Sequence, residues 1–200
     1  QLGAPGVSAH EVKQQSEFSV IYGPVRARDI PAFINAGMKA TPAIREVQFA
    51  FSERLILVPV EFVGGMKYLI FGTALCFLLS GINRAGYSVE LARINGLRIA
   101  VNFGLTYFAG TVIGPLFLPW LPGRAFAIKG AGAGLAAFLI AYGMGFIGNN
   151  PVNILAWLLL MPAAASFILM NFTGASTFTS LSGVKKEMKS AVPIQAGSAV

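Results

Sequence analysis

The order of apolar and charged positions divides the chain into a mixed N-terminal part and a long apolar part. Between Lys129 and Lys185 there is no charged residue. A helix needs about 20 apolar residues to cross the hydrocarbon core of a bilayer, so this stretch is long enough for two crossings and a turn. A soluble domain would place charges along such a length, because its outer faces must be hydrated. The pattern therefore predicts an integral membrane protein over most of the chain.

Four apolar segments are expected to cross the bilayer as helices. They cover residues 66–82, 97–118, 130–147 and 152–172. Residues 55–63 are also apolar, but Pro59 and Glu61 interrupt them. This segment is expected to be either an interfacial helix or the start of a long first membrane helix, kinked at Pro59 or at Gly64-Gly65. Four crossings are preferred, and a fifth at residues 55–63 stays open.

Small residues four positions apart predict where the crossings pack closely. No crossing carries a charge at mid-depth, which argues against a pump or a charge-coupled transporter. The glycines expected at helix contacts are the pairs Gly110/Gly114 and Gly130/Gly134, together with Gly143 and Gly145.

The N-terminal part reads as a short series of mixed elements. Residues 3–16 predict a turn and a helix with Ser8 as the N-cap. Residues 18–22 are a β-rich run closed by a Gly-Pro turn, and Asp29 is expected to cap a second helix. Helix, strand, loop and helix are typical of an α/β unit. Since about fifty residues cannot close a sheet, we expect the C-terminal piece of a larger domain.

Composition and charge agree with a membrane protein and limit the candidate chemistry. Hydrophobic residues make up 55% of the chain and charged residues 12%, which fits neither a disordered chain nor an ordinary soluble domain. The net charge of +7 comes mostly from connectors and the tail, so we interpret it as a topology signal and expect no nucleic-acid partner. Cys76 is the single cysteine, within an apolar run, and the lone His10 is expected to face solvent.

The distribution of basic residues predicts the orientation. After four crossings the tail lysines return to the side of the N-terminal part, which places both in the cytoplasm under the positive-inside rule. Arg124 and Lys129 fall on the same side, whereas the connector with Arg84 and Arg93 is discordant. A fifth crossing would instead put the tail outside. The chain begins at Gln1 without an initiator Met, and we expect it to be part of a longer or processed protein.

No catalytic constellation stands out, so candidate chemistry is limited to two loops. These are Gly3-Ala4-Pro5-Gly6 and Gly23-Pro24-Val25-Arg26. Open α/β sheets bind ligands at the carboxyl ends of their strands, where helix N-termini and loop N–H groups point. Arg26 and Arg28 could contact a phosphate or an amide-rich cofactor edge. Two ordinary turns with solvated arginines are the alternative.

Three runs carry a resemblance to known families. They are APGVSAHEV at 4–12, VIYGPVRARDIPAF at 20–33 and AGMKATP at 36–42. Together they resemble the corrinoid-binding domain of the corrinoid iron–sulfur protein large-subunit family. Because a multi-pass membrane region follows directly, the whole chain resembles the family of corrinoid-dependent mercury-methylating membrane proteins of anaerobic bacteria and archaea. Members of that family are described with five membrane helices, which keeps that count open.

The resemblance implies a cofactor, a reaction and a partner. It implies a cobalamin-type corrinoid and transfer of a methyl group from cobalt to inorganic Hg(II), forming methylmercury. It also implies a ferredoxin-like partner with two 4Fe–4S clusters that returns cobalt to its reduced state. The family's cobalt-ligating cysteine lies in a motif that this chain lacks, so no catalytic or metal-ligating residue is expected here. The corrinoid contacts expected from the loops and the resemblance are Gly3, Ala4, Pro5, Gly6, Val7, Tyr22, Gly23, Pro24, Val25 and Arg26.

These inferences give one expected organisation. Residues 1–51 would be the C-terminal part of a Rossmann-like α/β domain in the cytoplasm, and residues 52–65 an interfacial or kinked linker helix. Residues 66–180 would form a helical bundle in the inner membrane, and residues 181–200 a basic cytoplasmic tail. Two other functions remain open: a corrinoid-binding membrane protein with another methyl acceptor, and a small multi-pass transporter with a soluble segment.

Overall fold

A computed structural model of the chain describes residues 8–24, 26–39, 41, 50–172 and 181–198. The contacts divide the chain into two units, Gln1–Phe49 and Ala50–Val200. The first unit holds short helices, and the second holds long helices.

The first unit contains the two expected helices, joined by an irregular segment. Their bounds are Ala9–Ser16 for α1 and Ile30–Asn35 for α2, which follows the short 3₁₀ helix η2 at Ala27–Asp29. Ser8 caps α1 as expected, since its hydroxyl accepts a hydrogen bond from the Glu11 N–H at 3.4 Å. Asp29 does not cap α2 through its side chain. It lies within η2, with helical rather than extended dihedrals, and an N-cap normally needs an extended backbone.

The strand expected at residues 18–22 is not formed. These residues have no regular secondary structure, and Phe18 and Ile21 are 77% and 56% exposed. A strand needs a neighbour to accept its backbone hydrogen bonds, and the described residues of this unit supply none. The expected Rossmann-like architecture is therefore not seen in the part of this unit that the structure describes.

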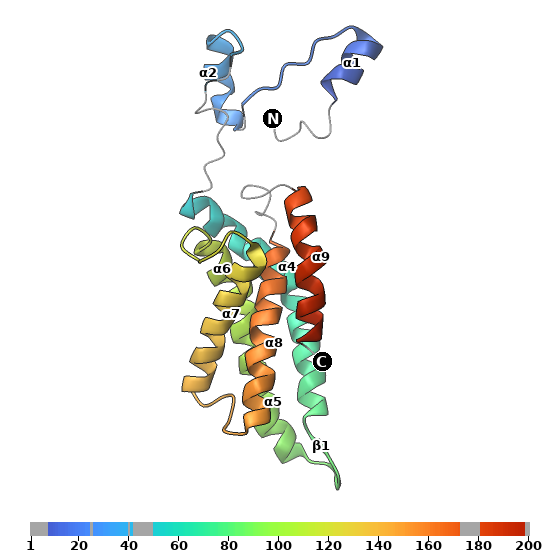
Figure 1. Ribbon diagram of the computed structural model, residues 1–200, viewed down its shortest axis with the longest axis vertical. Helices are drawn as coiled ribbons and strands as arrows, with labels where there is room; N and C mark the ends of the chain where they lie inside the picture. The colour runs from blue at the N-terminus through green and yellow to red at the C-terminus, as the bar shows by residue number, and fades with distance from the viewer. Residues whose placement is uncertain (1–7, 25, 40, 42–49, 173–180, 199–200) are drawn as a thin grey trace. The chain divides into compact units, whose positions relative to one another are not determined.

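The second unit is a bundle of long helices (Figure 1). Four stretches are long and apolar enough to span a membrane: Phe51–Leu79, Val89–Leu116, Phe126–Gly143 and Pro151–Met170. Within the described residues this number agrees with the four crossings preferred from the sequence. The chain is thus a multi-pass helical membrane protein by the length and composition of its helices. The elements are α4 (Phe51–Leu79), α5 (Val89–Phe108), the π-helix η3 (Ala109–Ile113), α6 (Gly114–Leu116), α7 (Phe126–Gly143), α8 (Pro151–Met170) and α9 (Leu181–Gly197).

The first membrane helix begins earlier than residue 66, because α4 continues through Pro59 and both following glycines. The Glu53 carboxylate accepts a hydrogen bond from the Ala50 N–H at 3.2 Å and so satisfies one free donor at the helix start. Of the two interpretations of residues 55–63, the structure shows the long continuous helix.

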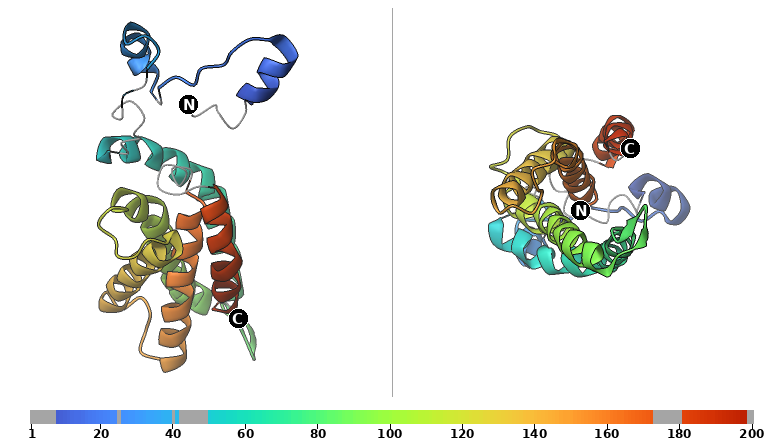
Figure 2. Two further views of the ribbon diagram at one scale, coloured as in Figure 1. Left: turned by 45° about the horizontal axis from the view of Figure 1, so that its top comes forward. Right: turned by 90° about the horizontal axis from the view of Figure 1, so that it is seen from below.

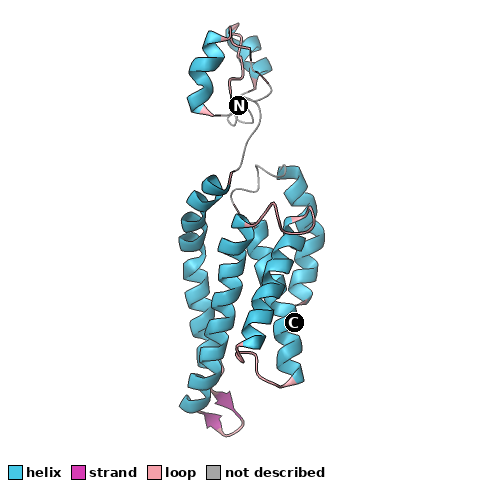
Figure 3. Ribbon diagram, turned by 90° about the vertical axis from the view of Figure 1, so that its left-hand side faces the viewer, coloured by secondary structure: helices cyan, strands magenta, loops and turns pink. Residues whose placement is uncertain are grey.

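A short hairpin joins α4 to α5 (Figure 3). Strands β1 (Ile82–Asn83) and β2 (Gly86–Tyr87) pair antiparallel, with Ile82 opposite Tyr87. The Ser88 hydroxyl then accepts a hydrogen bond from the Leu91 N–H at 3.3 Å and caps α5. The polar connector expected here is therefore a tight turn, and the second crossing starts sooner than predicted.

Helices α7 and α8 pack most closely, and small residues make this possible. A Cβ added at Gly130 or Gly134 would lie only 2.6 Å from the backbone of α8. Ala133, Ala137 and Ala141 of the same helix are buried. The pair Gly130/Gly134 is therefore confirmed as a helix contact. The view along the bundle in Figure 2 shows these helices side by side.

The second predicted glycine pair also makes contacts, and the other two glycines do not. A Cβ at Gly110 or Gly114 would lie 2.8 Å from Ile168 or Leu169 of α8. By contrast, nothing lies within 4 Å of a Cβ built at Gly143 or Gly145. The prediction was wrong for these two: Gly143 ends α7 without a close neighbour, and Gly145 lies in the turn beyond it with a positive φ of 79°, a conformation that favours glycine.

The basic tail contains a helix that packs against the bundle. Near its end the Gln195 amide donates to the Ser166 hydroxyl of α8 at 2.7 Å. At the first turn of α7 the Ala127 N–H donates to the Glu187 carboxylate. Lys185, Lys186 and Lys189 remain exposed. α9 thus joins α7 and α8 through polar contacts, while its lysines stay outside the packing.

Candidate functional site: a cavity in the bundle and the expected cofactor loops

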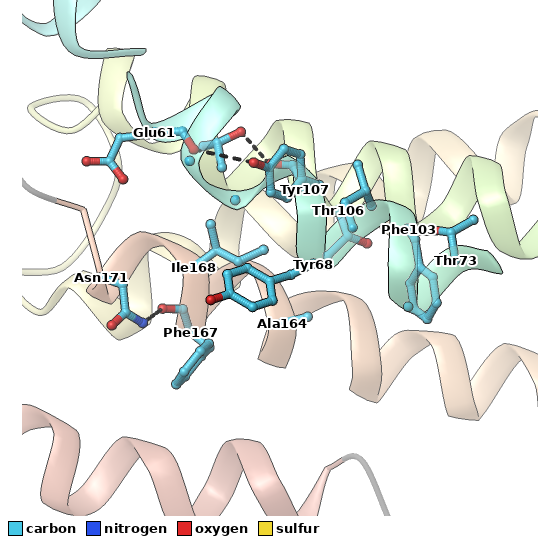
Figure 4. Close-up of a pocket in the computed structure, with 15 residues that line it drawn as sticks. Glu61, Tyr68, Thr73, Phe103, Thr106, Tyr107, Ala164, Phe167, Ile168 and Asn171 are labelled. Atoms are coloured by element: carbon cyan, nitrogen blue, oxygen red, sulfur yellow. Dashed lines mark hydrogen bonds between the residues drawn. The ribbon is translucent and has the colours of Figure 1, made fainter. Parts of the chain in front are cut away.

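A cavity of about 510 Å³ lies between α4, α5 and α8 (Figure 4). Most of its lining is apolar or aromatic. The residues that line it belong to α4, α5, η3 and α8, with Asn171 directly after α8: Glu61, Gly64, Gly65, Tyr68, Leu69, Gly72, Thr73, Phe103, Thr106, Tyr107, Thr111, Ala164, Phe167, Ile168 and Asn171.

Tyr107 fixes one wall of the cavity because it ties α5 to α4. Its hydroxyl donates to the Phe62 carbonyl at 2.5 Å and lies 3.3 Å from the Glu61 carbonyl. A Cβ at Gly65 would lie 2.5 Å from the same hydroxyl, so only glycine leaves room for this approach. Helical carbonyls can accept a second hydrogen bond, and here α4 does so without losing its own ladder.

The polar groups on the other walls are mostly satisfied within their own helices. Thr106 and Thr111 each donate to a carbonyl one turn earlier, at 2.7 Å, and the Asn171 amide donates to the Phe167 carbonyl at 2.7 Å. Thr73 differs, because its hydroxyl is buried without a partner among the described residues. The cavity therefore offers mainly apolar surface, and the Thr73 hydroxyl is a buried polar group in its wall.

These walls favour an uncharged, largely apolar occupant. Glu61 brings the one carboxylate to the lining, and in Figure 4 this carboxylate points away from Tyr107. Across the described residues there is no group of three or more His, Cys, Asp or Glu side chains able to hold a metal ion. Cys76 lies one helical turn beyond Thr73 and does not line the cavity.

Four of the ten residues expected to contact a corrinoid fall within the described part of the chain. The Tyr22 hydroxyl accepts a hydrogen bond from the Ala9 N–H at 3.1 Å, so this loop contacts the start of α1. Pro24 is buried, Arg26 is half-buried, and Gly23 lies beside the Phe33 ring. The remaining six lie outside the described residues: Gly3, Ala4, Pro5, Gly6, Val7 and Val25.

Two further side chains in the described part of the first unit bear on the expected cofactor contacts. The Tyr22 hydroxyl is already used by Ala9, and the only histidine of the chain, His10, is exposed on α1. The loop packs through Gly23 against the ring of Phe33 in α2, and Phe33 is 6% exposed.

Comparison of the chain with protein-family models, with curated proteins and with solved structures gave no match. The class that the fold defines is thus a multi-pass helical membrane protein preceded by a small unit of short helices. The cavity was not predicted from the sequence. The spacing of Gly65, Gly72 and Thr73 along one face of α4 was the available signal.

Proposed function

We propose that this chain is the membrane anchor, and the trailing segment of the cofactor domain, of a corrinoid-dependent methyltransferase that passes a methyl group from cobalt to Hg(II). One observation carries the proposal: the runs at 4–12, 20–33 and 36–42 precede a multi-pass membrane unit in one chain. The cobalt ligand and the reductant would come from outside these residues, the reductant from a ferredoxin-like protein with two 4Fe–4S clusters.

In this proposal the residues of the first unit hold and orient rather than react. Tyr22 and Ala9 join the loop after residue 22 to the start of α1, and the Phe33 ring supports Gly23. The corrinoid supplies the methyl-transfer chemistry when it is bound. The membrane helices would keep that domain at the cytoplasmic face of the inner membrane.

The test uses the gene product that contains this chain, expressed anaerobically in its membrane. We expect cobalt and a corrinoid absorbance spectrum to copurify with it, and methylmercury to form from added mercuric chloride. Replacing Arg26 by Gln should lower the corrinoid content about tenfold, because it would remove one charge-assisted hydrogen bond to the corrinoid. Lys13→Gln on the exposed face of α1 is the matched control and should leave the content unchanged.

Other outcomes separate the alternatives. Cobalt and corrinoid without methylmercury would indicate a corrinoid protein with another methyl acceptor. Absence of both from a folded, membrane-inserted product would exclude the corrinoid proposal altogether. An equal loss of corrinoid content in Arg26→Gln and Lys13→Gln would show that the loop does not contact the corrinoid.

The cavity favours a second candidate function, namely binding or transport of an apolar molecule. About 510 Å³ lined by aromatic and threonine side chains is within the range of small-molecule sites. Filling it with Gly72→Phe should abolish ligand uptake by proteoliposomes and leave corrinoid content unchanged. Gly64→Phe would not serve as the control because Gly64 also lines the cavity. Gly104→Phe is suitable, since its Cβ would meet nothing within 4 Å.

A further inference from the structure

Two buried cations lie against the same short segment after α6. Arg54 in the first turn of α4 is 3% exposed, and Lys129 near the start of α7 is 8% exposed. The Arg54 guanidinium carbon lies 5.5 Å from the centre of the Trp120 ring. The Lys129 ammonium donates to the carbonyl of Leu118. Residues 118–120 therefore contact both cations.

Neither cation has an acidic partner within the described residues. The Arg54 Nε is buried without any hydrogen-bond acceptor there, and the Leu118 carbonyl is the acceptor found for Lys129. The carboxylates of neighbouring segments make other contacts: Glu53 accepts from the Ala50 N–H, and Glu187 accepts from the Ala127 N–H. A buried charge without a counter-charge is unfavourable, so an anion from outside these residues would complete the arrangement.

Two aromatic rings pack around the buried guanidinium of Arg54. The ring centres of Phe51 and Trp120 lie 5.9 Å and 5.5 Å from its guanidinium carbon. Stacked aromatic rings cover the faces of a guanidinium, whereas its N–H groups point outward in the plane and can bind two oxygens at once. Phe51 and Trp120 are 46% and 65% exposed. The cluster formed by Arg54 and these two rings therefore reaches the surface.

The position of the cluster also suits a headgroup. Arg54 lies at the start of the first membrane-spanning helix and Trp120 follows the second. Tryptophan at the end of a membrane helix is typical of the headgroup level. Anionic phosphate groups are most concentrated there, and in the cytoplasmic leaflet they attract basic residues.

We propose that Arg54 and Lys129 form a binding site for a phosphate group that carries a net negative charge, with Trp120 at its edge. The guanidinium would bind two phosphate oxygens, and the ammonium would act as a second positive charge. A phospholipid headgroup and free phosphate share this chemistry, and the experiment separates them. The proposal is independent of corrinoid binding.

The lipid arm uses Trp120 as a reporter in the full chain. The chain has two tryptophans, so Trp157→Phe leaves Trp120 as the only one. In phosphatidylcholine nanodiscs we add a small fraction of either dibrominated phosphatidylglycerol or dibrominated phosphatidylcholine and measure fluorescence quenching. Both lipids carry a phosphate, but the choline cation neutralises it in phosphatidylcholine. Binding at two cations without a counter-charge therefore predicts half-maximal quenching at about tenfold lower mole fraction of the phosphatidylglycerol.

The second arm measures binding of radiolabelled inorganic phosphate by the detergent-solubilised chain in equilibrium dialysis. Saturable binding of phosphate that Arg54→Gln abolishes would support the site with free phosphate as its source. Preference for phosphatidylglycerol without such binding would support the lipid source. Equal quenching by both lipids together with no saturable phosphate binding would overturn the proposal.

Variants test whether the named cations are responsible. Arg54→Gln and Lys129→Gln should each remove the preference, and Arg54→Lys should weaken it because lysine lacks the planar fork. Arg124→Gln is the matched control, since Arg124 is exposed in the same loop, and it should behave like the parent. If the variants fail to fold, native mass spectrometry of the unaltered chain decides: equal retention of phosphatidylglycerol and phosphatidylcholine would also overturn the site.

Discussion

Gly134 lies where two membrane helices touch. A Cβ there would lie 2.6 Å from the Met161 carbonyl oxygen and from the Pro162 Cα, and backbone atoms cannot move aside as a flexible side chain can. We therefore expect Gly134→Ala to lower the free energy of unfolding by about 1–3 kcal/mol. Gly132→Ala in the same helix meets nothing within 4 Å, and we expect it to be neutral or stabilising by up to about 1 kcal/mol. Denaturant titration in micelles measures both, and equal effects would contradict the close contact.

Tyr107 offers a second test, of the polar link between α4 and α5. Tyr107→Phe removes its donation to the Phe62 carbonyl, and the expected loss is about 1 kcal/mol. Tyr142→Phe is the control, because Tyr142 is exposed and stacks on Phe138 with ring centres 6.1 Å apart. If thermal unfolding showed the same loss in both variants, the hydrogen bond would contribute nothing of its own.

Single residues differ in how far the sequence could predict their role. The Gly130/Gly134 contact was predictable, because a four-residue spacing of small residues places them on one helix face. The burial of Arg54 was not, since a basic residue beside Glu53 at the start of a membrane helix normally lies at the interface. Its cover comes from Trp120, and pairing of residues so distant cannot be read from local spacing.

The packing of α4 against α5 depends on another glycine. A Cβ at Gly96 would lie 2.3 Å from the Phe77 ring, so Gly96→Leu should force the two helices apart and destabilise the chain by about 2 kcal/mol. Gly104→Leu on the same helix points into open space and should have little effect. The measurement is the temperature at which half the protein precipitates from detergent solution. A larger drop for Gly104→Leu would contradict this packing.

A whole element was predictable where its own sequence is enough to define it. Long apolar runs specified the membrane helices, and their ends shifted because α4 tolerates Pro59. The prediction of a strand at residues 18–22 was wrong. These residues have a high β-propensity, but a strand also needs a neighbouring strand to pair with. The packing of α9 was not predicted, because its three lysines indicate an exposed tail. The contacts that join it to the bundle come from Glu187 and Gln195.

At the level of the whole molecule, the cavity could not be predicted. Its walls come from α4, α5 and α8, and their relative rotation follows from contacts such as Tyr107 on Gly65. Hydropathy identifies the helices that cross a membrane but not which faces meet. The same limit applies to the first unit, where candidate residues were chosen from a resemblance and only four of ten lie in the described part.

The number of crossings determines which ends of the chain share a side of the membrane. If all four candidate helices cross the membrane, residues 39 and 186 would lie on one side and residues 85 and 149 on the other. In a Cys76→Ala background we expect an impermeant maleimide to label Ala85→Cys and Asn149→Cys in intact cells. Lys39→Cys and Lys186→Cys should react only after permeabilisation, because the positive-inside rule predicts that the basic ends are cytoplasmic. Permeabilised cells, in which all four must react, are the control. Labelling of Lys186→Cys but not Lys39→Cys in intact cells would require an odd number of crossings and would place the tail lysines outside.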